Sequence, residues 1–230
     1  MRAILLGLCA LIMAAAAPRP AADVARDPAR KPAEVLAFAG VRPGWKVGEY
    51  TPGGGYFTRV LAAAVGADGR VYAYPPAEIV RLLPNHLTDA QAIAAAAPNV
   101  TVLTGPTAAF AAPEPLDLVF SAQNYHDLHT RFAPPGAAAA FNNAVFAALK
   151  RGGRYVIVDH AAQPGTGAAA ADKLHRIDPA VVRAEIEAAG FVFDGEAAVL
   201  ANPQDPRTAS VFDPSVRGAT DQFAYRFRKP

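Results

Sequence analysis

Apolar and polar residues follow two periods along most of this chain. Short apolar runs of strand length alternate with longer segments whose apolar residues fall on one helical face, as between Tyr56 and Val65. The short runs predict seven strands, over residues 45–50, 70–74, 100–103, 116–121, 154–159, 191–200 and 222–228. The longer segments predict helices over residues 32–39, 56–65, 77–97 with a break near Pro84, 136–149 and 178–189. This alternation implies a mainly parallel sheet with helices on both faces.

A different pattern occupies the first 32 residues. Met1 and Arg2 precede an apolar run that ends at Ala17, is too short to span a bilayer comfortably, and has the layout of a secretory signal. We therefore predict a signal peptide over residues 1–17, a linker over 18–32 and one folded domain over 33–230. The protein is then exported, to the periplasm or out of the cell, without stable membrane insertion after the signal is removed. A buried N-terminal helix is the alternative.

Composition narrows the class of protein further. With 52% hydrophobic and 18% charged residues the chain suits a packed globular domain. The 22 basic and 20 acidic residues leave a net charge of only +2, so no long-range field indicates a nucleic-acid or anionic-membrane partner, and we predict a small-molecule substrate. The one cysteine, Cys9, lies inside the predicted signal, which removes disulfides and thiolate chemistry from the mature domain.

Ligands of such sheets bind beyond the carboxyl ends of the strands. The loops expected at this edge span residues 49–56, 74–78, 104–107, 121–129 and 159–178. Four of the five histidines fall in two of these loops, namely His126, His129, His160 and His175. This uneven distribution makes the two loops candidates for a site.

The segment from Asn124 to Asp127 carries the first candidate chemistry. The Asn124 amide can accept from a hydroxyl or amine, Tyr125 can pack on a planar substrate, and His126 can take a proton near neutral pH. The alternative is a capped turn, in which Asn124 or Asp127 satisfies exposed backbone N–H groups.

His160 and His175 follow the fifth predicted strand and can meet His126 across the cleft. One hypothesis is a general base whose imidazole is oriented by Asp159 or Asp178. A second is a zinc or iron site made by the three histidines and a carboxylate, although no close-spaced ligand motif supports it and we assign no metal ligands. A third is a structural role.

Two further side chains near these histidines have ambiguous roles. Arg176 can hold an acidic substrate or pair with Asp178 or Glu185. Asp178 is also the predicted N-cap of the helix that follows.

The turn Gly53-Gly54-Gly55 lies between a predicted strand and a predicted helix, where a missing Cβ lets a ligand approach the backbone. The stretch from Val47 to Thr58 reads VGEYTPGGGYFT and resembles the first motif of class I S-adenosylmethionine-dependent methyltransferases. Residues 116–121 (LDLVFS) and 149–159 (LKRGGRYVIVD) are similar to the family's fourth and fifth strands, and the resemblance covers roughly residues 33–230. Within the family, the chain is similar to an exported branch of methyltransferase-like proteins.

The competing nucleotide and hydrolase motifs are absent. A dinucleotide site requires a third glycine where Thr58 stands, and neither a Gly-x-Ser-x-Gly elbow nor a Walker sequence is present.

The resemblance implies a Rossmann-like three-layer α/β sandwich, with a mainly parallel seven-stranded sheet and an antiparallel last strand. It also implies S-adenosylmethionine as the cofactor and methyl transfer as the reaction. The residues that it places at the cofactor are Glu49 at the amino-acid end, Gly53 and Gly55 in the turn, and Tyr56 after it.

The chain departs from the family's pattern at the other end of the cofactor. The acid that usually binds the ribose falls at Tyr74 or Pro75, so that Glu78 is the substitute, and the acid near the adenine falls at Pro106. An exported ligand-binding protein that has lost cofactor binding or catalysis is therefore the second hypothesis.

Overall fold

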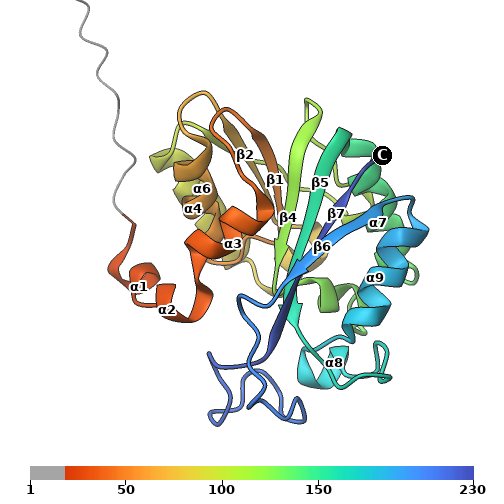
Figure 1. Ribbon diagram of the computed structural model, residues 1–230. Coiled ribbons are helices and arrows are strands. Elements are labelled where there is room, and N and C mark those ends of the chain that lie inside the picture. Colours follow the sequence, from red (N-terminus) through yellow and green to blue (C-terminus); the bar gives the residue numbers. More distant parts are fainter. Residues whose placement is uncertain (1–18) are drawn as a thin grey trace, which may run out of the picture.

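The computed structural model describes residues 19–230, so the predicted signal peptide lies outside the described residues. One seven-stranded sheet crosses the molecule in the order β3-β2-β1-β4-β5-β7-β6 (Figure 1). Its strands are β1 (Lys46–Tyr50), β2 (Arg70–Tyr74), β3 (Val100–Val102), β4 (Leu116–Ala122), β5 (Leu149–His160), β6 (Val192–Ala197) and β7 (Gln222–Arg228). Only β7 runs antiparallel to its neighbours β5 and β6. The predicted Rossmann-like architecture with an antiparallel last strand is confirmed.

All five predicted helical segments are present, and three short helices, over residues 21–24, 27–30 and 171–174, were not predicted. The helices are α1 (Ala21–Val24), α2 (Asp27–Arg30), α3 (Pro32–Ala39), α4 (Tyr56–Val65), α5 (Ala77–Leu82), α6 (Asn85–Ala96), α7 (Ala137–Ala148), α8 (Ala171–Leu174) and α9 (Pro179–Ala188). Two 3₁₀ turns, η1 (Thr107–Ala109) and η2 (Tyr125–His129), follow β3 and β4. The break expected near Pro84 separates α5 from α6, since proline lacks the N–H that a continuous helix needs.

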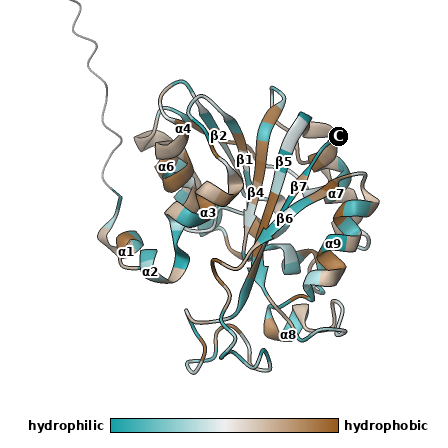
Figure 2. Cartoon of the chain, in the orientation of Figure 1, coloured by the Kyte–Doolittle hydropathy of each residue, from teal (hydrophilic) through white to brown (hydrophobic). Residues whose placement is uncertain are grey.

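Each face of the sheet buries its own apolar cluster. On one face α3, α4 and α6 cover the sheet, and Leu61 and Val65 of α4 are fully buried against it. On the other face α7 and α9 do the same, with Phe141 and Ile186 fully buried. The central strand β4 is mainly hydrophobic apart from Asp117 and Ser121, and β5 is hydrophobic over residues 155–158 (Figure 2), as expected for strands covered on both sides. The loops at the sheet edge therefore extend from a packed core of sheet and helices.

The chain changes direction at the centre of the sheet. β1 pairs in parallel with β2 on one side and with β4 on the other. The loop after β1 enters α4 on one face, whereas the loop after β4 leads to α7 on the opposite face. The two loops diverge, and in sheets of this kind ligands bind at such a divergence; the region beyond the carboxyl ends of β1 and β4 is called the crevice below.

Residues 19–31, which fall in the predicted linker, contain α1 and α2 and contact the start of α4. Asp23 forms an ion pair with Arg59 at 2.7 Å. The Tyr56 hydroxyl donates to Asp27 Oδ1 at 2.6 Å. This segment therefore lies against the glycine turn and borders the crevice.

None of the helices within residues 19–230 combines the length and the apolar character needed to cross a membrane.

Candidate active site

The glycine turn after β1 forms one wall of the crevice. Gly53 has a φ of +56°, in the left-handed region that favours glycine. A Cβ added to Gly53 or Gly54 would meet no heavy atom within 4 Å, whereas one at Gly55 would collide with Ile93 of α6. The first two glycines thus border open space, and the third lets the turn pack closely on α6.

Buried polar atoms without partners gather at this turn. Glu49 is 3% exposed, and its Oε2 has no hydrogen-bond partner among residues 19–230. The same holds for Thr51 Oγ1 and Ser121 Oγ, at the ends of β1 and β4. Burial raises the pKa of Glu49 to about 7, because the charged carboxylate is poorly solvated there. Buried polar groups usually have a partner in the protein or in ordered water, so these three atoms mark a place where a water or a polar ligand would bind.

Arg30, from α2, lies over the same turn. Its guanidinium is 4.8 Å from the centre of the Tyr56 ring and donates to Gln123 Oε1 at 2.6 Å, at the end of β4. Burial lowers the pKa of Arg30 to about 10, a value at which the side chain stays cationic at neutral pH. The partly buried cation Arg30 and the buried acid Glu49 therefore flank the glycine turn. Sequence reasoning missed Arg30 because it lies in the predicted linker.

The second wall of the crevice contains a paired histidine and aspartate. The backbone N–H of His126 in η2 donates to Asp159 Oδ2 at 2.8 Å, and its ring Nδ1 donates to Asp159 Oδ1 at 2.9 Å. Burial opposes the charged form of His126, but the adjacent Asp159 carboxylate outweighs it and raises the pKa of His126 to about 9. Burial acts to raise the pKa of Asp159, but the positive charge of His126 outweighs burial, so the pKa of Asp159 lies below its ordinary value.

Two more side chains meet the other nitrogen of His126. His175 Nδ1 lies 3.3 Å from His126 Nε2, and Asp127 Oδ1 lies 3.4 Å from the same atom. Burial, and then the charge of His126, lower the pKa of His175. Burial raises the pKa of Asp127 to about 6. The predicted meeting of His126 and His175 across the cleft is therefore present, with Asp127 as a third member.

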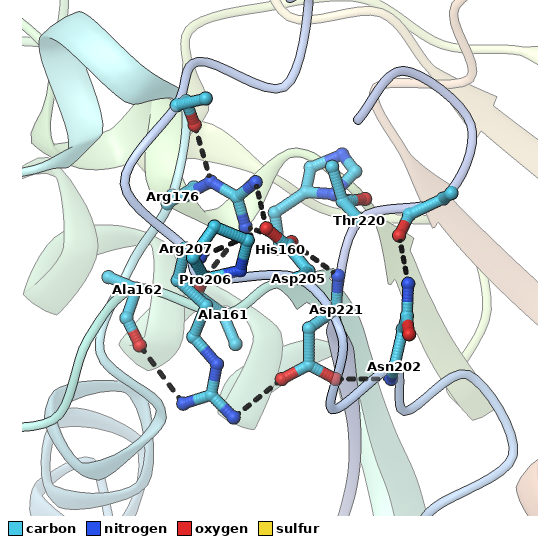
Figure 3. A network of polar contacts seen from close by, with 12 residues as sticks. His160, Ala161, Ala162, Arg176, Asn202, Asp205, Pro206, Arg207, Thr220 and Asp221 are labelled. Carbon is cyan, nitrogen blue, oxygen red and sulfur yellow. Dashed lines mark hydrogen bonds and ion pairs between the residues drawn. The ribbon is translucent and has the colours of Figure 1, made fainter. Parts of the chain in front are cut away.

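A buried polar network holds the loop that carries His175 (Figure 3). Arg176 is fully buried and forms two contacts with Asp205, at 2.8 and 3.2 Å. Asp205 Oδ2 also accepts the backbone N–H of Asp221 at 2.7 Å, and Asp221 pairs with Arg207 at 2.6 Å. The network ties residues 198–221 to the end of β5. Arg176 thus pairs with neither Asp178 nor Glu185, the partners expected from sequence, and it is not available to an acidic substrate.

His160 belongs to this network rather than to the cleft. Its Nδ1 lies 2.7 Å from the Thr220 hydroxyl, and the residue is 9% exposed (Figure 3). Burial lowers the pKa of His160 to about 4, so it is a weak base. The general-base role considered for His160 does not suit this position, and a positioning role does.

No protein-family model matches the sequence, and no curated protein matches it either. Solved structures do match. One is an S-adenosylmethionine-dependent methyltransferase from Aquifex aeolicus, with a TM-score of 0.60 and 18% identity over 92% of this chain and 98% of that chain. Another is Aeropyrum pernix fibrillarin with natively bound S-adenosylmethionine, with a TM-score of 0.54 and 13% identity over 85% and 73% of the two chains.

The chain has the class I methyltransferase fold. At these identities the likeness concerns the fold alone. The cyclase SpnF is also similar, with a TM-score of 0.62 and 14% identity over 88% of this chain and 80% of that chain. A methyltransferase fold therefore does not by itself identify the reaction, which has to be argued from the site.

The end of β2, where the sequence resemblance placed the ribose, carries no carboxylate. Tyr74 ends β2 and is buried, and its hydroxyl donates to the Pro106 carbonyl at 3.0 Å. Glu78 accepts the Thr107 N–H at 3.1 Å and the Thr107 hydroxyl at 3.1 Å. Glu78, Thr107, Tyr50 and Asp127 line one pocket. The predicted substitute Glu78 is therefore at the edge, but it is already partly satisfied by protein groups.

The other candidate residues of the loop after β4 form hydrogen bonds within the protein. The Asn124 amide donates to the carbonyls of Thr51 and Ala122, at 3.0 and 2.6 Å, and so ties the loop after β4 to the loop after β1. Tyr125 is fully buried, and its hydroxyl donates to Glu185 at 2.8 Å. The role predicted for Tyr125, packing on a planar substrate, does not suit this core position. His129 also bonds Glu185, at 3.0 Å, and lies outside the cluster of His126.

Backbone strain is concentrated around the crevice. Five non-glycine residues of the described chain have positive φ, and among them Thr51, Gln123 and His175 lie at the ends of β1 and β4 and in the histidine cluster. Such conformations cost roughly 1–3 kcal/mol each and persist where the surrounding structure enforces them, often at functional sites.

Proposed function

We propose that this protein binds S-adenosylmethionine and transfers its methyl group to a small-molecule acceptor. The observation that carries the proposal is the glycine turn with its unsatisfied, buried Glu49 on a methyltransferase fold. The amino-acid end of the cofactor bears an ammonium and a carboxylate. Glu49 would accept from the ammonium, and Arg30 would donate to the carboxylate.

When bound, the cofactor would supply an electrophilic methyl group. The protein residues would bind and orient the cofactor. Gly53 and Gly54 leave room for its close approach, and Tyr56, on whose ring Arg30 stacks, would border the cofactor next to this turn. The acceptor would enter beside the loop after β4, where Asn124 ties the two loops together and His126 and His175 face one another. Holding the two reactants in line is the main source of rate in this proposal.

The ribose side supports a second candidate function, a ligand-binding protein without chemistry. Tyr74 stands where the family has an acid, and its hydroxyl is already bonded to the Pro106 carbonyl. Glu78 is partly satisfied by Thr107. The two candidate functions differ in what happens to the ligand. In the second, the ligand binds in the crevice and is released without chemical change.

Calorimetry of the purified protein with S-adenosylmethionine and with its demethylated product tests the first proposal. We expect dissociation constants within about 1 μM to 1 mM, the usual range for enzyme substrates. Arg30→Ala should weaken binding about 10-fold or more, since a charge-assisted hydrogen bond contributes roughly 1.5–3 kcal/mol.

Arg26→Ala is the matched control for Arg30→Ala. Arg26 also stacks on Tyr56, at 5.3 Å, but it is exposed, so its loss should leave the affinity nearly unchanged. Absence of binding at millimolar ligand would refute the proposal. Equal effects of the two arginine variants would refute the role of Arg30.

We also propose export of the protein, on the strength of the apolar run before Ala17. Expression of the full chain in a bacterial host, followed by cell fractionation and N-terminal sequencing, tests this. We expect a mature N-terminus close to Ala16 in the exported fraction. A cytoplasmic protein that retains Met1 would contradict the export.

A further inference from the structure

We propose that His126, Asp127 and His175 form a binding site for one divalent transition-metal ion, best suited to Zn²⁺. Three potential ligand atoms, His126 Nε2, His175 Nδ1 and an Asp127 carboxylate oxygen, all lie within 4.8 Å of one another. Two imidazoles and a carboxylate are a common ligand set for zinc and for other first-row divalent metals. The inference does not depend on cofactor binding, because none of the three residues lies at the glycine turn.

Two of the three spacings between these atoms match tetrahedral coordination. Zinc binds imidazole nitrogen at about 2.0–2.1 Å and carboxylate oxygen at about 2.0–2.2 Å, so two ligands at a tetrahedral angle are roughly 3.3–3.5 Å apart. The distances from His126 Nε2 to His175 Nδ1 and to Asp127 Oδ1 are 3.3 and 3.4 Å. These two distances therefore already suit an ion, and the third, between His175 Nδ1 and the Asp127 carboxylate, is within 4.8 Å.

Hydrogen bonding alone accounts less well for this arrangement. His126 Nε2 can carry one proton, and a single N–H points at one acceptor. His175 Nδ1 and Asp127 Oδ1 lie at nearly equal distances of 3.3 and 3.4 Å from that nitrogen. An N–H on Nε2 can point at only one of them, whereas a cation placed between the three atoms is attracted to all of them once the two ring nitrogens present lone pairs.

Asp159 provides the outer-sphere support that metal-binding histidines usually have. It accepts the His126 Nδ1–H at 2.9 Å, so Nε2 is the nitrogen that faces the cluster and that would exchange its proton for the metal ion. Asp159 is itself fixed by the backbone N–H groups of His126 and His160, at 2.8 and 2.7 Å. This is the carboxylate–histidine–metal arrangement with the carboxylate already in place.

The third ligand is also held in position before any ion binds. His175 ends α8 with a φ of +54°, and its ring packs on Phe212 with the ring centres 4.8 Å apart. The next residue is Arg176, whose buried pair with Asp205 fixes the backbone. A left-handed backbone at a histidine costs free energy of folding, and such conformations, where the surrounding structure enforces them, often occur at functional sites.

The site would keep one coordination position open. It offers three protein ligands, as catalytic zinc sites do, while structural sites usually have four. The Asp127 side chain is 26% exposed and lines the pocket that also contains Glu78 and Thr107. A water or an oxygen of a small molecule in that pocket would complete the coordination.

Equilibrium binding of Zn²⁺ and of Co²⁺ to untagged, chelator-treated protein tests the site. We expect about one ion per chain and the intense visible absorption that Co²⁺ shows in a tetrahedral site. Asp127→Asn and His175→Asn should each weaken Zn²⁺ binding by more than about 100-fold, which exceeds the roughly 10–100-fold effect of losing an outer-shell partner. Asn at position 175 preserves the left-handed backbone, because Asn tolerates positive φ.

Two controls keep the test decisive. His86→Ala removes a half-buried histidine of α6 outside the cluster and should leave Zn²⁺ affinity unchanged. Circular dichroism of each variant without metal verifies folding, and Asp159→Asn should weaken binding about 10–100-fold in a folded protein. A wild-type protein that binds Zn²⁺ no more tightly than His175→Asn would overturn the proposal. S-adenosylmethionine affinity, measured on the same samples, separates this outcome from failure of the proposed function.

Discussion

Glu49 shows how one buried side chain can serve a ligand at the expense of stability. Its pKa of about 7, against an ordinary value of 4.5, means that the folded protein binds more protons than the unfolded chain between these two pH values. The stabilising contribution of the protonated carboxyl is therefore complete below about pH 4.5 and is lost as the pH rises through about 7.

Glu49→Gln should abolish this pH dependence, because glutamine does not ionise. At about pH 8 we expect the variant to be more stable than wild type by roughly 1–3 kcal/mol, and at about pH 4 the difference should vanish. Urea unfolding at both pH values measures it. The same variant should bind S-adenosylmethionine more weakly if Glu49 accepts from its ammonium. An unchanged stability difference across pH would show that Glu49 does not titrate in this range.

At the scale of elements, the segment from β6 to β7 depends on one buried ion pair. Asp205→Ala leaves Arg176 as an uncompensated buried charge, which typically costs about 3–5 kcal/mol. Asp213→Ala is the matched control, because Asp213 lies in the same segment, is exposed, and within residues 19–230 its side chain hydrogen-bonds only to the neighbouring Ser215. We expect that control to change stability by less than about 0.5 kcal/mol in urea unfolding. Similar values for both variants would contradict the role given to Arg176.

The start of α9 gives a second test at this scale. Asp178 caps the helix by accepting the Ala180 N–H at 3.0 Å, as the sequence predicted, and it also accepts the Gly165 N–H at 2.6 Å. Asp178→Ala should therefore destabilise the protein by about 1–2 kcal/mol. Asp178→Asn retains a cap oxygen and should recover much of that loss. Thermal unfolding of the two variants measures the difference, and equal losses would show that the capping oxygen is unimportant.

At the scale of the whole molecule, two ligands acting on separate walls of the crevice should stabilise it independently. A ligand at 100 times its dissociation constant adds about 2.7 kcal/mol, which corresponds to a rise in Tm of roughly 5–10 °C for a domain of this size. We expect S-adenosylmethionine and Zn²⁺ each to produce such a shift and the shifts to add approximately, since Glu49 and Arg30 share no contact with His175. Differential scanning calorimetry with each ligand and with both measures this. A shift with one ligand only would identify which of the two sites is absent.

The sequence by itself determined the fold class, the succession of strands and helices along the chain, and the position of the glycine turn. These features depend on local periodicity and on spacings of a few residues, as in the run from Glu49 through Tyr56. The sequence also predicted that His126 and His175 lie at the same edge of the sheet, because parallel strands have their carboxyl ends at one edge.

Only the tertiary structure decided how those residues are used. His126 meets Asp159 and His175 across separations of 33 and 49 residues, and Arg30 meets Gln123 across 93. No local pattern reports which way a loop side chain turns, so the burial of Tyr125 and the pairing of Arg176 with Asp205 could not be predicted. The packing of the loops on the sheet selected Asp127, rather than His160, as the third member of the cluster, because burial against Thr220 holds the His160 ring away from it.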